Sequence, residues 1–219
     1  AIVRLSGIYA QSLDSVWISD ESERAFLIDS VGTIKRMIDL KKYLEDQEQL
    51  LINTNYAMLT SHLFYNASRH SLMFLVKHTP SNTFIVKEVF IDEVGKMATY
   101  QLSSSKVVPD MSKGYAYINF PNVNFVGENI VYNYPVESSI YMLDIRTNER
   151  KYILADSHYT SNIIEKCTTS GDYATLEKHW LENSHFYDIM YLPKYKIYAR
   201  LHADKVDFDE KKGMEKIIN

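Results

Sequence analysis

Residues 26–38 read FLIDSVGTIKRMI, and two later stretches repeat the same pattern. Residues 90–102 read FIDEVGKMATYQL, and residues 141–154 read YMLDIRTNERKYIL. In each copy a run of apolar residues reaches an Asp, a short polar turn follows, and a second run begins. Apolar runs of this length, bounded by turn residues, are typical of antiparallel strands joined by tight turns. The sequence therefore predicts a repeated β unit.

The Asp of each copy is expected to end the third strand of its unit and to cap the turn into the fourth. Asp side chains bond backbone groups two residues on, and Gly supplies the positive φ that such turns need. Asn tolerates the same left-handed region, so it can replace Gly in the third copy. The predicted turn residues are Asp29, Gly32, Asp92, Gly95, Asp144 and Asn148. A metal site shared by the three Asp residues is disfavoured, because successive units hold these turns apart.

The copies recur about every 50 to 65 residues, which is the period of a β-propeller blade with loop insertions. We therefore predict an all-β fold, a β-propeller of four-stranded antiparallel blades. About three blades are complete and part of a fourth is present, from a parent of about six blades. The predicted organisation is one incomplete propeller domain over residues 1–219, with blades at approximately 1–50, 51–110, 111–155 and 156–219. A short insert helix over 172–183 is predicted from Tyr173, Leu176 and Trp180 at helical spacing.

Composition narrows the class of protein. The chain has 219 residues, of which 46% are hydrophobic and 24% charged, and its net charge is −4. Nucleic-acid binding is disfavoured, since it calls for a basic excess. No apolar run reaches the roughly 18 to 20 residues of a membrane-spanning helix. Cys167 is the only cysteine, so no internal disulfide forms, and whether its thiol is reactive stays open.

No established catalytic motif stands in the sequence. The nucleophile elbow, the phosphate-binding loop, the dinucleotide fingerprint and the zinc-protease helix are all missing. The seven His residues include no pair at zinc-ligand spacing on a recognisable helix. We therefore predict no catalytic residue, no metal site and no cofactor.

Two groups of residues are candidates for ligand binding. On the predicted hairpin over 185–202, Tyr198, Arg200 and His202 project to one side of a strand, as His185, Tyr187 and Tyr191 do on its partner. Aromatic rings beside Arg and His suit a sugar or a carboxylate. The alternative is a polar face that merely meets water. The second group precedes the third blade: Tyr115, Tyr117, Asn119 and Asn122. Its alternative is that the two Asn residues hold the turn around Pro121.

Residues 115–149, YAYINFPNVNFVGENIVYNYPVESSIYMLDIRTNE, resemble a family of uncharacterised six-bladed propeller lipoproteins of Bacteroidales-type gut bacteria, a domain of unknown function. The segments Asn119–Asn122 (NFPN), Asp156–Thr160 (DSHYT) and His185–His202 carry the likeness further. The resemblance implies an exported protein of the cell envelope, periplasmic or on the surface, with a lipid anchor on an N-terminal leader that this sequence lacks.

Three functions follow from these observations. The first is a non-catalytic binding or scaffold propeller with a protein or carbohydrate ligand of the envelope. The second is a lyase or hydrolase acting on a glycan or another envelope polymer, with His202, Arg200 and a Tyr as acid–base groups. The third is an assembly module whose open sheet edges pair with a partner. Whether the protein is an enzyme stays uncertain, and the residues favour a protein that is not one.

Overall fold

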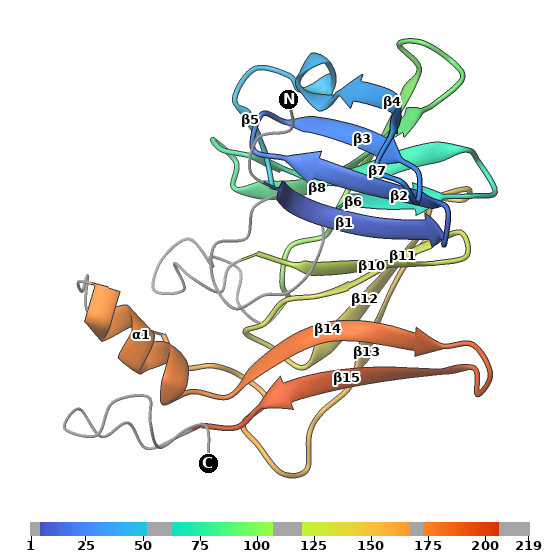
Figure 1. Cartoon of the computed structure of the whole chain (residues 1–219). Helices are drawn as coiled ribbons and strands as arrows, with labels where there is room; N and C mark the ends of the chain where they lie inside the picture. The colour runs from blue at the N-terminus through green and yellow to red at the C-terminus, as the bar shows by residue number, and fades with distance from the viewer. Residues whose placement is uncertain (1–4, 52–62, 107–119, 167–172, 206–219) are drawn as a thin grey trace. The chain divides into compact units, whose positions relative to one another are not determined.

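The computed structural model describes residues 5–51, 63–106, 120–166 and 173–205 (Figure 1). The chain divides into two compact units, Ala1–Ser104 and Ser105–Asn219. Both units consist mainly of antiparallel strands that pair with their neighbours along the chain. The prediction of one domain over 1–219 stays a prediction.

The first sheet of the N-terminal unit is a four-stranded meander in the order β1-β2-β3-β4. Its strands are β1 (Leu5–Ser12), β2 (Ser15–Asp20), β3 (Arg24–Ile28) and β4 (Ile34–Asp39). A short 3-10 helix, η1 (Leu40–Tyr43), follows directly. The repeated segment 26–38 covers the end of β3 and most of β4, and β1 pairs with β2 at the other side of the sheet.

The second sheet of this unit has the order β5-β7-β8-β9, and β6 also pairs with β7. Its strands are β5 (Glu48–Leu50), β6 (Leu63–Asn66), β7 (Ser71–His78), β8 (Thr83–Phe90) and β9 (Met97–Gln101). β5 comes from residues that the sequence placed in the first blade. It pairs instead with the second half of β7, where Leu50 lies opposite Val76.

One apolar core joins the two sheets of the N-terminal unit. Trp17 and Ala25 from the first sheet and Leu72 and Phe74 from the second are fully buried in the same cluster. Their neighbours Ile18, Phe26 and Met73 are buried as well, so both faces of these strands are covered at this point. Burial of such side chains contributes roughly 1.5–3 kcal/mol each.

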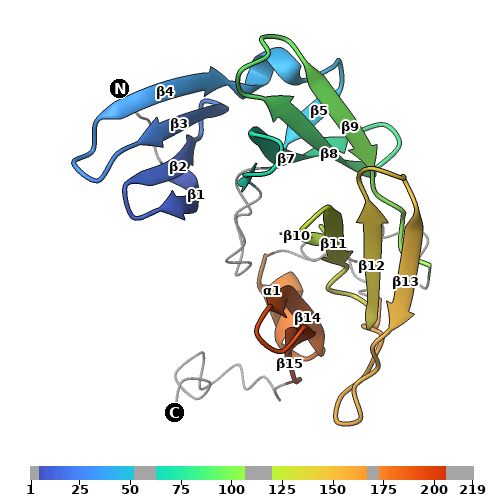
Figure 2. The same ribbon diagram turned by 90° about the vertical axis from the view of Figure 1, so that its right-hand side faces the viewer.

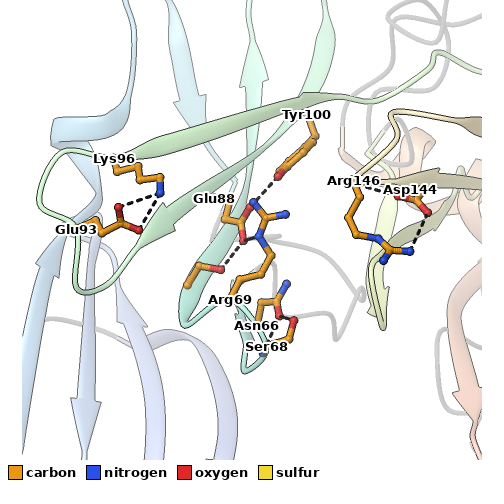
Figure 3. A network of polar contacts seen from close by, with 10 residues as sticks. Asn66, Ser68, Arg69, Glu88, Glu93, Lys96, Tyr100, Asp144 and Arg146 are labelled. Carbon is orange, nitrogen blue, oxygen red and sulfur yellow. Dashed lines mark hydrogen bonds and ion pairs between the residues drawn. The ribbon is translucent and has the colours of Figure 1, made fainter.

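Two charged networks are buried among these apolar residues. Lys87 on β8 has no exposed side-chain surface, and its Nζ lies 2.5 Å from Oε2 of Glu48, which is 3% exposed. The same ammonium donates to the carbonyl of Tyr43 at 2.8 Å. The neighbouring Glu88 is equally buried and is held by Arg69, Ser71 and Tyr100 (Figure 3). Each buried charge therefore has an opposite charge and further hydrogen bonds, the condition under which burial is tolerated.

The C-terminal unit contains a second four-stranded meander, with the order β10-β11-β12-β13 (Figure 2). Its strands are β10 (Asn122–Val126), β11 (Asn129–Asn133), β12 (Ser139–Asp144) and β13 (Arg150–Leu154). The short helix α1 (Tyr173–Leu181) and the hairpin of β14 (His185–Leu192) and β15 (Ile197–Ala203) follow. The fold is all-β with four-stranded antiparallel sheets and one insert helix, a partial β-propeller, so the predicted fold class is confirmed.

Side-chain amides connect β10 to β14 within this unit. Asn122 Nδ2 donates to the carbonyl of Phe186 at 3.1 Å, and Asn124 Nδ2 donates to the carbonyl of Ile189 at 2.9 Å. Beside them an apolar cluster of Val131, Ile140 and Ile189 fills the space between the meander and the hairpin. The hairpin is therefore fixed to the meander by polar and apolar contacts together.

Two of the three predicted Asp turns have the expected hydrogen bonds. The Asp29 carboxylate accepts the backbone N–H of Thr33 at 2.7 Å, and Gly32 adopts φ 82°. Asp144 accepts the N–H groups of Arg146 and Thr147, and Asn148 adopts φ 58°. The hydrogen bond from Lys35 is the main cause that lowers the pKa of Asp29, and the N–H of Thr33 is the second. The N–H of Thr147 is the main cause that lowers the pKa of Asp144.

Asp92 lies in the turn between β8 and β9 but does not cap it, so the prediction that it caps this turn is wrong. Its carboxylate lies 3.1 Å from Arg36 Nη1 and 3.0 Å from His70 Nδ1. β8 ends at Phe90, whose N–H bonds the carbonyl of Lys96 as Asp29 bonds Thr33. The residue in the capping position is thus Phe90. The turn is closed by Gly95 at φ 80° and by the Glu93–Lys96 ion pair at 2.8 Å (Figure 3).

Candidate functional site

The residues singled out on β15 line one cleft of the C-terminal unit. Tyr198 and Arg200 lie opposite Tyr191 and Ile189, and His202 lies opposite Phe186. Because paired residues of an antiparallel ladder point to the same face, these side chains share the face that meets the β10–β13 meander. Tyr198 and Arg200 are thus half-buried against the protein, while His202 at the end of this face is exposed.

A β-bulge in β14 changes which residues join this face. The register shifts between Phe186 and Ile189, so the strand carries one more residue there than its partner. The expected residues were His185, Tyr187 and Tyr191, and that prediction is wrong for His185 and Tyr187, which contact each other on the other side of the strand. Phe186 lies on the cleft face instead and stacks on His202, with ring centroids 6.0 Å apart. His185 lies opposite Ala203 and packs on Trp180 of α1 at 3.6 Å between centroids.

Arg200 is the central polar residue of the cleft. Nη1 donates to the carbonyl of Ser138 at 2.7 Å, and Nη2 donates to the carbonyl of Ala155 at 2.8 Å. The guanidinium also lies 4.1 Å from the centroid of the Phe186 ring. Burial lowers its pKa to about 10, and nearby Asp156 opposes that shift, so the group is charged at neutral pH. Arg200 therefore fastens the hairpin to the loop that follows β13.

That loop, residues 155–165, is held in one conformation by its own side chains. The Asn162 amide accepts the N–H of Ser157 at 2.6 Å and donates to the Ser157 carbonyl at 3.1 Å. Thr160 Oγ1 lies 3.2 Å from Nδ1 of His202, which ties the loop to β15. Tyr159 stands at the tip with 89% of its surface exposed. An exposed aromatic ring is thus presented on an ordered loop.

Two clefts flank this loop tip. The smaller has a volume of about 310 Å³ and contains the face of β15 described above. It is lined by Ile140, Ala155, Asp156, Ser157, His158, Tyr159, Phe186, Tyr198, Arg200 and His202. The larger has a volume of about 720 Å³ and lies between the loop and the start of β14. Its lining includes Thr160, Glu165, His179, Glu182, Asn183 and Asp204. His158 and Tyr159 line both clefts.

The second predicted group is not assembled in the same way. Tyr115, Tyr117 and Asn119 fall outside the described residues, so their role as ligand-binding residues stays a prediction. Asn122 is only 3% exposed, and its amide holds β14 through the Phe186 carbonyl. The structure thus gives Asn122 a role in joining β10 to the hairpin, which is neither of the two roles considered from the sequence.

Two buried titratable groups lie on β14 outside the clefts. Burial lowers the pKa of His185 to about 4. Burial also raises the pKa of Asp188 to about 6, and Oδ1 of this carboxylate has no hydrogen-bond partner in the structure. His185 Nε2 is 3.0 Å from the Tyr187 hydroxyl. The bulge region therefore holds two groups whose protonation depends on folding.

Acidification is expected to destabilise the protein through His185. The unfolded chain takes up this proton near pH 6.5 and the folded chain only near pH 4. The contribution of the neutral imidazole is complete above pH ~6.5 and is lost toward pH ~4, by about 3 kcal/mol at most. Asp188 has the opposite dependence between about pH 4 and 6, but it is present in wild type and His185→Gln alike. Urea unfolding at pH 7 and 4.5 should show a smaller acid loss for His185→Gln, and equal losses would contradict the assignment.

The clefts contain polar groups without a recognisable catalytic pair. Ser138 donates its hydroxyl to Asp156, and His202 faces Thr160, so these groups bond to structural partners rather than to each other. Among the described residues, no three His, Cys, Asp or Glu side chains gather closely enough to hold a metal ion. None of the described helices has the length and apolar character needed to cross a membrane.

Comparison with known proteins gives a fold without an activity. No family model matches the sequence, and no curated protein matches it. A crystal structure of a member of the DUF4221 family from Bacteroides vulgatus is similar, with a TM-score of 0.69 and 12% identity over 93% of this chain. This chain spans 59% of that one. The β-propeller domain of Cps50 (Swd1) from Myceliophteria thermophila is more distant, with a TM-score of 0.39, 13% identity, and coverage of 72% and 43% of the two chains.

At these identities the first likeness supports the fold and nothing finer. It agrees with the resemblance drawn from the sequence, which also pointed to a domain of unknown function from Bacteroidales. The lipoprotein character that the resemblance implied is not part of that agreement.

Sequence reasoning found the β15 residues of the site but missed the loop that faces them. Asp156, Ser157, His158 and Tyr159 line the smaller cleft with Arg200. The signal for this loop was a polar segment, DSHYTSN, directly after the last strand of the meander. Such segments are common in loops, and the contacts of Arg200 with Ala155 and of His202 with Thr160 reveal which strand this one faces.

Proposed function

We propose that the protein is a non-catalytic binding module of the cell envelope and that its site is the cleft around Arg200. The observation that carries this proposal is the way in which the cleft is preformed. Arg200 fixes its base, and the Asn162 amide fixes the loop beside it. A site already in its bound shape loses little conformational entropy on binding, so modest polar contacts suffice for affinity.

The same contacts favour binding over catalysis. General acid–base work needs two titratable groups directed at one position in the substrate. Here Asp156 accepts from Ser138, and two donors of Arg200 bond backbone carbonyls. These groups shape the cleft, and what they leave open to a ligand is mainly the edges of His158, Tyr159 and His202.

Export to the envelope, periplasmic or at the surface, belongs to the same proposal. It is supported by the resemblance of residues 115–149 to a family of exported lipoproteins. Because the chain spans 59% of that structure, the ligands and partners of a longer parent of about six blades, and its lipid anchor, are proposals as well.

The test is a binding assay combined with a turnover assay on the full chain. Calorimetry and proton–nitrogen NMR would be run with a neutral oligosaccharide, an acidic oligosaccharide and a short peptide. Chromatography of each mixture after a day would detect any cleavage. We expect binding of at least one probe without product, and weaker binding by His202→Ala. Product formation, or binding that is indifferent to His202, would contradict the proposal.

A second candidate function is assembly through the other face of the hairpin. Ile197 and Leu201 lie on the face of β15 away from Arg200, and both are exposed, as is Met190 on β14. β15 contains neither Lys nor Pro, the residues that usually protect an edge strand. A second copy of the chain that paired with the edge of β15 would also cover the apolar residues Ile197 and Leu201.

If assembly is the function, Leu201→Lys should convert a dimer to a monomer, because it places a charge in an apolar interface. Light scattering would measure the molar mass at a protein concentration of about 100 µM, which is well above the Kd expected of a specific dimer. Val31→Lys is the matched control, since Val31 is exposed in a turn of the other unit. A wild-type chain that is monomeric under these conditions excludes this candidate.

A further inference from the structure

The two clefts of the C-terminal unit meet at the loop tip, and together they are called the groove. His158 and Tyr159 belong to the lining of both, so these two side chains form the boundary that the clefts share. The bond between Thr160 and His202 runs alongside the same tip and holds it in place. Together the clefts provide about 310 and 720 Å³, a space that suits an extended ligand of several units.

The lining of this groove has the chemistry of a sugar-binding surface. It offers hydroxyl, imidazole, amide and carboxylate groups, while its apolar part consists mainly of aromatic rings. The Tyr159 ring is 89% exposed, although its loop is fixed by the Asn162 amide. A rigid, exposed aromatic ring binds the apolar face of a pyranose by stacking, and the surrounding polar groups bond the hydroxyls. An apolar drug-like ligand would find few such contacts.

The distribution of charge excludes an acidic ligand. The larger cleft has Glu165, Glu182 and Asp204 in its lining against a single cation, Lys205. In the smaller cleft Arg200 lies near Asp156 and has two donors bound to carbonyls. Asp156 thus partly balances the charge of Arg200, and two of the guanidinium donors are already bonded to carbonyls. A carboxylate ligand, which the sequence suggested, is therefore disfavoured. An anion would meet repulsion along most of the groove.

We propose that this groove binds a neutral oligosaccharide, with the Tyr159 ring stacked on one sugar between the two clefts. The inference rests on the proposed binding function and names the class of ligand. The ligand must contain at least two linked sugars, because a single sugar ring cannot contact both clefts.

Calorimetric titration of the full chain tests this inference with defined probes. These are tetra-N-acetylchitotetraose and maltotetraose as neutral chains, the corresponding monosaccharides, tetragalacturonate as an acidic chain, and a neutral tetrapeptide. We expect one neutral tetrasaccharide to bind at least tenfold more tightly than its monosaccharide and than tetragalacturonate. Tyr159→Ala should weaken this binding about five- to tenfold through the lost stacking, whereas Tyr159→Phe should retain it.

Tyr195→Ala is the matched control, because Tyr195 is also an exposed tyrosine but lies in the β14–β15 turn, outside the lining of both clefts. Its affinity should equal that of wild type. Tighter binding of tetragalacturonate would overturn the inference, as would equal binding of monosaccharide and tetrasaccharide. Binding of the tetrapeptide alone, lost in Tyr159→Ala, would overturn it while the binding function stands. If no probe binds, the inference and the proposed function both fail.

Discussion

Lys87→Met is expected to lower the free energy of unfolding by about 3–5 kcal/mol. The reason is what the substitution leaves behind. Glu48 is 3% exposed and lies 2.5 Å from the ammonium, so its carboxylate would lose its close counter-charge inside the protein. The carbonyl of Tyr43 would lose its donor at the same time. Urea unfolding followed by circular dichroism measures the effect.

A double substitution distinguishes the lost charge from lost packing. In Lys87→Met with Glu48→Leu both charges are gone, and an apolar pair of similar volume replaces them. Most of the stability should then return, because the attraction within a buried ion pair exceeds the free-energy cost of desolvating its two charges by only a little. Lys96→Met is the exposed control and should leave the urea midpoint unchanged, since its pair with Glu93 is solvated on both sides. A double variant as unstable as Lys87→Met would contradict this account.

Arg200→Ala is expected to cost about 2–4 kcal/mol and to loosen the hairpin from the meander. It removes two charge-assisted hydrogen bonds, each with a net contribution of roughly 1.5–3 kcal/mol, and water that enters the cleft recovers part of the loss. It also removes the contact with the Phe186 ring. Arg200→Lys should recover only part of this, because one ammonium cannot reproduce the planar fork that reaches both Ser138 and Ala155.

The measurement is urea unfolding monitored by the fluorescence of Trp180, which lies in the same unit as Arg200 and packs on His185. Arg146→Ala is the control, because that guanidinium is largely exposed and only 3.9 Å from Asp144, so the midpoint should not move. If Arg200→Ala unfolds at the wild-type midpoint, the hairpin is held by its apolar contacts and Arg200 is free to serve a ligand instead.

The strands of this fold were predictable where their residues repeat a local pattern. The runs around Phe26, Phe90 and Leu143 have apolar residues at strand spacing and end in turn residues, so their pairing needs no distant information. β1 has Ser, Gly and Ala among its eight residues, LSGIYAQS, and that weak pattern hid it. β5 is three residues long, and only its pairing with β7 makes it a strand.

The site was only partly predictable, because it depends on contacts between distant segments. Arg200 and His202 could be placed on one face by counting along β15. The bulge that replaces His185 by Phe186 leaves no clear mark in the sequence, since any residue can be the extra one. Likewise Asp92 satisfied the sequence pattern of a turn cap, but the backbone pairing of Phe90 with Lys96 decides the turn.

The amides that join β10 to β14 have a consequence for how such sheets keep their alignment. The two sheets of this unit share no ladder there, and a main-chain bond, from the Phe186 N–H to the Pro135 carbonyl at 3.0 Å, joins them. Asn122 and Asn124 are two positions apart, and the carbonyls that they reach, on Phe186 and Ile189, are three apart. The extra residue of the bulge reconciles the two spacings. A slide by one residue would break both amide bonds together, so the two asparagines and the Phe186 N–H favour the same single alignment of the sheets.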